Sequence, residues 1–150
     1  MTQECVMKTA ADYCKIVRDS DNYVTNWVCR GLNTKTDWVK DHVTFGVIKN
    51  NHLLAGLIFH DIEIGKMLYW TIYAQDKHWC TRRILKEFMR IAFEVFEVRR
   101  INILVDTDNE PCLSFVKKLG FQLEGCLRNF GDEGQNRFIL GLLKSENKYK

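Results

Sequence analysis

The chain contains a series of apolar runs separated by turn residues, and this pattern is clearest in its middle third. The runs VTFGVIK (43–49) and LLAGLIFH (53–60) flank Asn-Asn at 50–51, a pair typical of a two-residue hairpin turn. A second turn at 63–66, which contains a glycine, leads into MLYWTIYA (67–74). These runs are apolar at nearly every position, which is typical of strands buried on both faces. We therefore predict three consecutive strands in a sheet that helices cover on both sides.

Two later segments have the three- and four-residue spacing of amphipathic helices. Apolar residues in 84–96 form one broad stripe, which we interpret as core and not as a cofactor-binding feature. The second helix follows Asn109, which can cap its first turn, and Gly120 can adopt the left-handed conformation that ends it. We expect both helices to pack on the predicted sheet.

Residues 1–42 are more polar and their pattern is weaker. We predict two short helices in this segment, interrupted near 20–22, with Gly31 closing the second helix. Trp27 and Trp38 are interpreted as buried anchors, because large aromatic side chains are mostly buried.

Three further strands complete the pattern: INILVD (101–106) between the two later helices, then FQLEGCLRN (121–129) and RFILGLLK (137–144) as an antiparallel pair. The length of 150 residues suits one domain with a sizeable core. No internal repeat or linker interrupts the order of elements. The sequence therefore predicts one mixed α/β (α+β) domain over 1–150.

Composition narrows the class of protein. A hydrophobic fraction of 46% and a charged fraction of 27% are ordinary for a soluble globular protein. No apolar run approaches the roughly 20 residues of a membrane span, and the first residues lack the apolar core of a signal peptide. We expect a cytoplasmic protein that does not act on membranes. The net charge of +3 is too small to imply a polyanionic partner, and the aromatic residues of 84–96 fall on the buried stripe, so no nucleic-acid partner is predicted.

Six cysteines are scattered along the chain without a CxxC pair, so we expect free thiols in a reducing compartment. They stand at positions 5, 14, 29, 80, 112 and 126. The adjacent residues His78, Trp79 and Cys80 are a weak hint of a metal site. Their spacing is not that of a zinc site, and no metal is predicted.

Basic residues gather around the turn at 75–81 and the helix that follows. They are Lys77, His78, Arg82, Arg83, Lys86 and Arg90. They form either a solvated helix face or a site for a phosphorylated ligand. The turn has no glycine, but the first amides of a helix carry partial positive charge whichever residues supply them. We therefore expect the amides at 80–83 to bind phosphates, with Arg82 or Arg83 adding charge-assisted bonds. Trp79 would then point into the gap between helix and sheet.

The segment DTDNEPCLSFVKKLGFQLEGCLRN (106–129) resembles a signature of the GNAT superfamily of N-acetyltransferases. The matching residues are Asn109, Leu119, Gly120, Phe121, Glu124, Gly125 and Arg128. The resemblance covers about residues 43–143 and is strongest to the branch that includes ribosomal-protein N-terminal acetyltransferases. A set of bacteriophage-encoded proteins in that branch has Trp-x-Thr-Arg where the first long helix begins, and Trp79, Thr81 and Arg82 match this pattern.

The resemblance implies a GNAT-like single domain with a mixed, mostly antiparallel sheet of about six or seven strands and helices on both faces. Residues 1–42 would form a helical segment on the substrate side, and 43–150 the sheet and the coenzyme-binding core. The implied reaction is direct transfer of acetyl from acetyl-CoA to a primary amine of a protein or a small molecule. A homodimer is among the assemblies that the resemblance admits, and the host cytoplasm would be the location if the protein is phage-encoded.

The resemblance also places the coenzyme. The pantetheine contacts fall on Ile72, Tyr73 and Ala74, where the fourth strand of the family separates from the fifth; alternatively, these residues belong to an ordinary core strand. The other implied coenzyme contacts are Trp79, Cys80, Thr81, Arg82, Arg83, Asn109, Cys112, Phe115 and Lys118.

The chain departs from the family at positions important for catalysis. The glycines usual in the coenzyme turn are absent, and the glutamate that many relatives carry on the fourth strand falls near Tyr69. His60 is the best substitute for a general base, because an imidazole titrates near neutrality. The alternatives are a surface histidine at a strand end and a chain of water molecules. Cys112 replaces a serine of the branch and either protonates the leaving thiolate or packs as a small hydrophobe.

These departures support a second interpretation as well. The chain would then keep a GNAT-like fold as a non-catalytic module that binds a host or partner protein, with an eroded coenzyme site.

Overall fold

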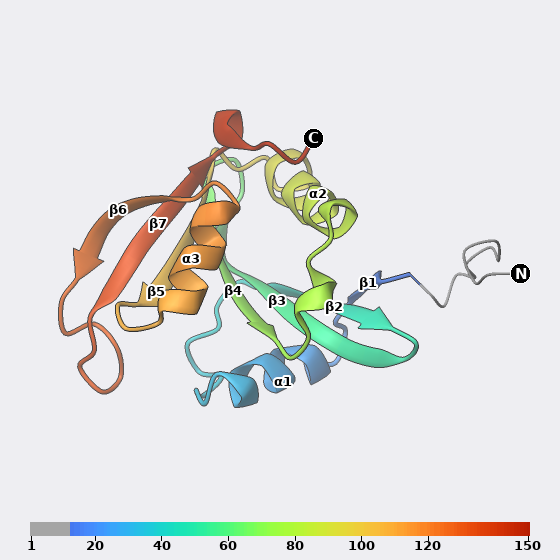
Figure 1. The fold of residues 1–150 in the computed structure, drawn as a ribbon, viewed down its shortest axis with the longest axis horizontal. Coiled ribbons are helices and arrows are strands. Elements are labelled where there is room, and N and C mark those ends of the chain that lie inside the picture. Colours follow the sequence, from blue (N-terminus) through green and yellow to red (C-terminus); the bar gives the residue numbers. More distant parts are fainter. Residues whose placement is uncertain (1–12) are drawn as a thin grey trace, which may run out of the picture.

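Seven strands form one continuous sheet in residues 13–150, the part of the chain that the computed structural model describes (Figure 1). The strand order is β1-β2-β3-β4-β5-β7-β6, and every neighbouring pair is antiparallel except β4 with β5. Helix α1 covers one face of the sheet, and α2 and α3 cover the other (Figure 1). This architecture confirms the predicted fold class. The elements are β1 (Lys15–Arg18), α1 (Tyr23–Gly31), β2 (Val43–Lys49), β3 (His52–Glu63), β4 (Met67–Ala74), the 3-10 helix η3 (Lys77–Trp79), α2 (Arg82–Arg90), the π-helical segment η4 (Ile91–Val95), β5 (Arg100–Asp106), α3 (Glu110–Lys118), β6 (Gln122–Leu127), β7 (Arg137–Leu143) and the 3-10 helix η5 (Lys144–Glu146).

The three strands predicted in the middle of the chain are present as β2, β3 and β4. Asn50 and Asn51 have φ values of 52° and 62°, the left-handed conformation that a tight two-residue hairpin turn requires at both positions. Gly65 has a φ of 79° in the turn between β3 and β4. The turn residues therefore define this part of the sheet as predicted.

The prediction for the N-terminal segment is wrong in one element. The first of the two predicted helices is replaced over Lys15–Arg18 by strand β1, which pairs with β2 from Lys15↔Ile48 to Arg18↔Phe45. The exposed edge of β2 offers backbone partners to any extended neighbour, and this pairing prevails over a weak local helical pattern. The part of that prediction before residue 13 lies outside the described residues. The second predicted helix is α1.

The core has two parts, one on each face of the sheet. The larger part lies under α2 and α3, where Phe59 of β3 and Phe88 of α2 are fully buried with ring centroids 6.1 Å apart. The smaller part lies under α1 and contains Val28 and Ile58. A Cβ atom at Gly56 would lie 2.4 Å from a methyl group of Val28, so the close approach of α1 to β3 requires glycine there.

Helix α1 ends at Gly31 as predicted, but for a different reason. Gly31 is not left-handed; a Cβ atom there would lie 2.3 Å from the ring of Tyr73 on β4. Trp27 and Trp38 are partly buried and pack against the smaller core, which agrees with their interpretation as anchors. Trp27 meets Tyr73 edge to face, with ring centroids 5.1 Å apart.

The boundaries of α3 confirm the sequence prediction. The side chain of Asn109 accepts a hydrogen bond from the backbone nitrogen of Cys112 at 3.3 Å. At the other end Gly120 has a φ of 110° and donates to the carbonyl of Lys117 at 3.0 Å. Phe121 N donates to the carbonyl of Val116 at 3.2 Å, which completes a Schellman ending.

Among the described residues, no helix combines the length and the apolar composition that crossing a bilayer requires. The five described cysteines are free, and they are Cys14, Cys29, Cys80, Cys112 and Cys126. Cys5 lies outside the described residues.

Candidate active site

The parallel strands β4 and β5 separate in the middle of the sheet. They pair at three positions only, of which Tyr69↔Asn102 is the last, whereas β4 continues to pair with β3 as far as Ala74↔Ala55. Beyond Tyr69, no strand pairing joins β4 to β5 within the described residues. Ile72, Tyr73 and Ala74, to which the resemblance assigns the pantetheine, lie on this separated part of β4.

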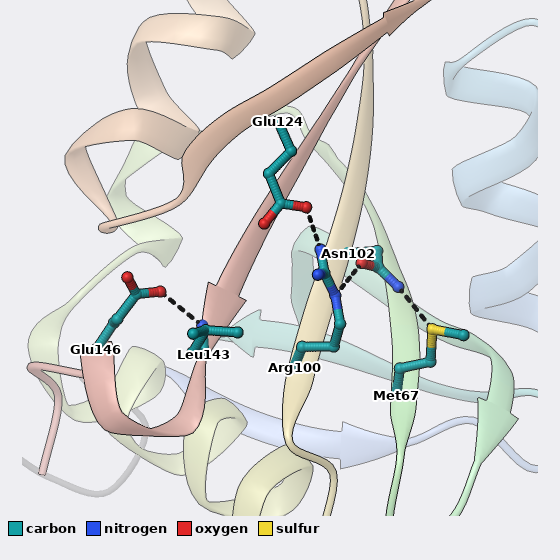
Figure 2. Close-up of polar contacts among 6 residues, drawn as sticks. All are labelled: Met67, Arg100, Asn102, Glu124, Leu143 and Glu146. Atoms are coloured by element: carbon teal, nitrogen blue, oxygen red, sulfur yellow. Dashed lines mark hydrogen bonds and ion pairs between the residues drawn. The ribbon is translucent and has the colours of Figure 1, made fainter.

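A layer of polar side chains lies where β4 and β5 are still paired (Figure 2). Arg100 donates from Nε to Asn102 Oδ1 at 2.7 Å and from Nη2 to the carboxylate of Glu124 on β6. Asn102, which is buried, donates to the sulfur of Met67 on β4 at 3.4 Å. Side chains from three strands therefore hold the end of the sheet from which the two strands diverge. The sequence analysis did not identify Arg100 or Asn102, although a polar residue inside the apolar run INILVD was a visible signal.

His60 is buried on β3, and its side chain is held on both sides. Nδ1 lies 2.6 Å from Asp61 Oδ2, and Nε2 lies 2.8 Å from Thr71 Oγ1 on β4. Only 6% of His60 is exposed, which rules out the alternative of a surface histidine at a strand end. Burial lowers the pKa of His60, and the hydrogen bond to Asp61 opposes this effect only in part. The imidazole is therefore neutral at physiological pH and can accept a proton.

Tyr69 and Trp38 surround His60 on the face of the sheet that α1 covers. The Tyr69 ring stacks on the imidazole with centroids 5.7 Å apart, and the Trp38 ring meets it edge to face at 4.9 Å. Successive side chains of a strand alternate between faces, so Tyr69 and Thr71 share this face with His60. Of the sequence predictions, His60 and Tyr69 are thus brought together. Thr71 and Trp38 were not identified as site residues, because their contacts with His60 depend on the tertiary structure. Asp61, the neighbour of His60 in the sequence, was interpreted as part of a solvated turn.

The start of α2 on the other face differs from the prediction in part. Trp79 is 3% exposed and meets Phe115 of α3 edge to face, with ring centroids 6.0 Å apart. The Thr81 side chain caps the helix by accepting from Ile84 N at 3.2 Å. The backbone nitrogens of Cys80 and Thr81 already donate to carbonyls of the preceding turn, so the prediction that all amides at 80–83 are available is wrong for these two. Those of Arg82 and Arg83 are the remaining candidates for an anion.

Both candidate arginines bond to distant parts of the chain. Arg82 Nη2 donates to the carbonyl of Lys148 at 3.1 Å, and its guanidinium lies 5.5 Å from the centre of the Tyr149 ring. Arg83 Nη2 donates to the carbonyl of Cys14. A phosphate that recruited these guanidinium groups would compete with two main-chain carbonyls.

The C-terminal tail, residues 147–150, spans α2 and α3 beside the start of α2 (Figure 1). After β7 the chain turns through η5, where Leu143 N donates to Glu146 Oε1 at 2.9 Å (Figure 2). Lys148 then donates from Nζ to the carbonyl of Lys118 at 2.7 Å, at the end of α3. Tyr149 packs against the larger core. The tail therefore connects the two helices over which the resemblance places the coenzyme.

Two thiols on this face stay protonated at neutral pH. Burial raises the pKa of Cys80 to about 11. Burial, and then the charge of Asp106, raise the pKa of the half-buried Cys112. Cys112 can therefore donate a proton, and it also packs against the larger core, so both sequence interpretations of this residue remain.

A groove of about 570 Å³ runs between α2 and the tail. Its lining includes Arg83, Lys86 and Arg90 from α2, and Lys144 and Lys150 from the end of the chain. It contains none of the β4 residues assigned to the pantetheine. A solvated basic face and a site for a phosphorylated ligand both fit this groove. Among residues 13–150, no group of three or more metal-ligating side chains could hold a metal ion.

The structure has the fold of the GNAT N-acetyltransferases. No family model matches the chain, and no curated protein matches its sequence. A spermidine N-acetyltransferase SpeG mutant from Vibrio cholerae matches with a TM-score of 0.71 and 14% identity over 91% of this chain and 95% of that chain. The dodecameric spermidine N-acetyltransferase from Vibrio cholerae matches with a TM-score of 0.70 and 15% identity over 88% and 94%. A protein provisionally described as an acetyltransferase matches with a TM-score of 0.62 and 21% identity over 71% and 61%.

Proposed function

We propose that the protein is an acyl-CoA-dependent N-acetyltransferase that transfers acetyl from acetyl-CoA directly to a primary amine. The observation that carries this proposal is the separation of β4 from β5 beyond Tyr69, with a buried neutral histidine on one face and the cationic start of α2 on the other. An opening between two strands lets two substrates meet from opposite faces of a sheet. Proximity of this kind supplies a large part of the rate in a transfer between bound partners.

In this proposal the coenzyme lies on the face of α2 and α3. Its pantetheine follows Ile72, Tyr73 and Ala74, whose main-chain groups also supply the donor for the oxyanion. The main-chain nitrogens and guanidinium groups of Arg82 and Arg83 hold the diphosphate at the start of the helix. Cys80, Thr81, Asn109, Phe115 and Lys118 shape the surrounding walls.

On the face of α1, His60 accepts the proton that the amine loses, and Asp61 stabilises the imidazolium that forms. Tyr69 stacks on the ring and helps to hold it in position. On the opposite face, we assign the protonation of the leaving thiolate to the thiol of Cys112 on α3, whose raised pKa keeps it protonated. The assigned base and acid come from opposite faces of the sheet, so neither group competes for the proton of the other.

The acceptor class has two candidates. The resemblance to ribosomal-protein N-terminal acetyltransferases and their phage-encoded relatives, with Trp79, Thr81 and Arg82 at the helix start, favours a protein N-terminus. The matching spermidine acetyltransferases favour a polyamine. On the same resemblance we infer action in the cytoplasm, that of a host if the protein is phage-encoded, and residues 1–42 as the segment that contacts the acceptor.

The alternative function is a non-catalytic module with an eroded coenzyme site. Its specific support is the burial of Trp79 against Phe115 and the bonding of Arg82 to the C-terminal tail. Thermal unfolding with acetyl-CoA, with free coenzyme A and without ligand separates the two functions. A ligand at about a hundredfold over its dissociation constant stabilises by roughly 2.7 kcal/mol. Release of free thiol with spermidine or with a peptide bearing a free N-terminus then tests turnover, and no stabilisation by either coenzyme would reject the enzyme.

A further inference from the structure

Thr71 connects the buried histidine to the separated part of β4. Its hydroxyl lies 2.8 Å from His60 Nε2, and the other ring nitrogen lies 2.6 Å from Asp61 Oδ2. An ionised carboxylate can only accept a hydrogen bond, so Nδ1 must carry the proton of the neutral ring. Nε2 is then an acceptor, and the Thr71 hydroxyl must donate to it. The donors and acceptors in the hydrogen bonds from Thr71 to His60 and from His60 to Asp61 are therefore set by the Asp61 carboxylate, which cannot donate.

Burial separates the roles of the two side chains. His60 is 6% exposed and is enclosed by Trp38 and Tyr69, so a bound amine does not reach its nitrogens directly. Thr71 is only partly buried, and it lies two residues beyond the last β4–β5 pair. Its hydroxyl therefore lies on the separated part of β4, in contact with His60 Nε2.

We propose that Thr71 is a catalytic residue that relays the proton of the acceptor ammonium to His60, an inference that rests on the proposed acetyl transfer. The ammonium nitrogen gives a proton to Thr71 Oγ1 while the hydroxyl proton moves to His60 Nε2, which leaves a neutral amine and an imidazolium bonded to Asp61. The amine lone pair attacks the thioester carbonyl and forms the C–N bond. The C–S bond then breaks as the Cys112 thiol protonates the leaving sulfur. The second nitrogen proton restores the Cys112 thiol, and the imidazolium returns its proton to solvent.

The electrostatic surroundings of His60 suit this role. Asp61 on the same strand favours the imidazolium, while His42, which precedes β2, opposes it. Tyr69 and Trp38 contribute aromatic rings that contact the imidazole. Burial keeps His60 neutral. When the ring accepts a proton, its positive charge lies beside the Asp61 carboxylate, whose Oδ2 is 2.6 Å from Nδ1.

The first experiment needs no coenzyme. Nitrogen-15 NMR of the imidazole should show the Nδ1–H form of His60 in the unaltered protein. Thr71→Val removes a hydrogen bond that stabilises the neutral ring, so the pKa of His60 should rise in this variant and return toward the original value in Thr71→Ser. An Nε2–H form in the unaltered protein, or a pKa that Thr71→Val leaves unchanged, overturns the relay.

The second experiment compares two amines of similar size, ethylamine and 2,2,2-trifluoroethylamine, as acceptors in a thiol-release assay. Ethylamine is almost wholly protonated at neutral pH, whereas the fluorinated amine is not. Loss of a proton relay should therefore reduce kcat/KM of Thr71→Val by about a hundredfold for ethylamine and by less than about fivefold for trifluoroethylamine. Thr71→Ser should restore most of the rate with ethylamine.

The outcomes distinguish the two proposals. If the unaltered protein binds no coenzyme and acetylates neither amine, the proposed function fails and the relay fails with it. If the unaltered protein is active and Thr71→Val loses the same factor with both amines, or loses nothing, the relay alone is wrong. Circular dichroism checks that the Thr71 variants are folded. We expect Thr71→Val to fold, because valine is well suited to a strand position.

Discussion

The two faces of the sheet at the β4–β5 separation differ in how their polar groups are engaged. On the face of α1, His60 has both ring nitrogens bonded to side chains that a proton relay can use. On the face of α2 and α3, Arg82 and Arg83 are bonded to main-chain carbonyls of residues 148 and 14. In the proposed enzyme, the acceptor side would therefore be preorganised, whereas the coenzyme side would exchange internal contacts for a ligand. The proposed enzyme should therefore be limited by coenzyme affinity more than by proton transfer.

The largest expected effect concerns Trp79. Its substitution distinguishes a residue that packs in the core from one that contacts the coenzyme. Trp79→Ala removes a side chain that is 3% exposed, so the free energy of unfolding should fall by about 3–5 kcal/mol. Ile64→Ala, at a position 75% exposed in a turn, is the control and should change stability by less than about 0.5 kcal/mol. Urea denaturation measures both. A stability close to the original, combined with lost coenzyme binding, would show that the indole belongs to the ligand site.

The next effect tests the acceptor side. His60→Gln removes the proposed base, and kcat/KM for a primary amine should fall by about a hundredfold to a thousandfold while coenzyme affinity stays unchanged. His52→Gln, at the exposed start of β3, is the matched control. Steady-state kinetics and calorimetric titration with acetyl-CoA provide the two readouts. An active His60→Gln variant would favour a water chain as the base.

The coenzyme side is tested by removing residues 147–150. Release of the bond from Arg82 to the Lys148 carbonyl and of the contact with Tyr149 should tighten coenzyme A binding by about tenfold. The gain should vanish when Arg82→Ala is added to the truncated protein, because the gain depends on the freed guanidinium. Calorimetric titration gives the affinities. Weaker binding after truncation would mean that the tail is part of the coenzyme site.

The smallest effect is the pH dependence of stability that His60 produces. Its pKa is lower in the folded protein than in the unfolded chain, so the unfolded chain binds the proton more tightly. The contribution is fully present above about pH 6.5 and is lost as the pH falls through the folded pKa. Urea denaturation between about pH 5 and 7 should show a steeper loss for the unaltered protein than for His60→Gln. Equal losses of stability with pH in the two proteins would show that a group other than His60 causes the pH dependence.

The fold could be predicted largely from local patterns. The hairpin turn at Asn50 and Asn51 and the bounded helix from Asn109 to Gly120 depend on residues with strong conformational preferences, and both are present. Strand β1 could not be predicted, because Lys15–Arg18 is extended only through its pairing with β2. Gly31 ends α1, but the ring that requires glycine there comes from Tyr73, which is distant in sequence.

The sequence predicted some residues of the candidate site but not the contacts between them. His60 and Tyr69 were identified by residue type and resemblance, but their stacking and the burial of His60 follow from the register between β3 and β4. Thr71 gave no signal in the sequence, because a threonine in an apolar run is typical of any strand. The bond from Arg82 to the Lys148 carbonyl was equally invisible, since it joins residues far apart in the chain.

By itself, the sequence determined the elements whose ends are marked by glycine, asparagine and apolar periodicity, and through them the class of fold. Only the tertiary structure decided which polar groups meet. Local preferences act over a few neighbouring residues. The hydrogen bond between Thr71 and His60, and those of the C-terminal tail to Arg82 and Lys118, exist because sheet pairing and helix packing bring separate segments within 3.1 Å of one another.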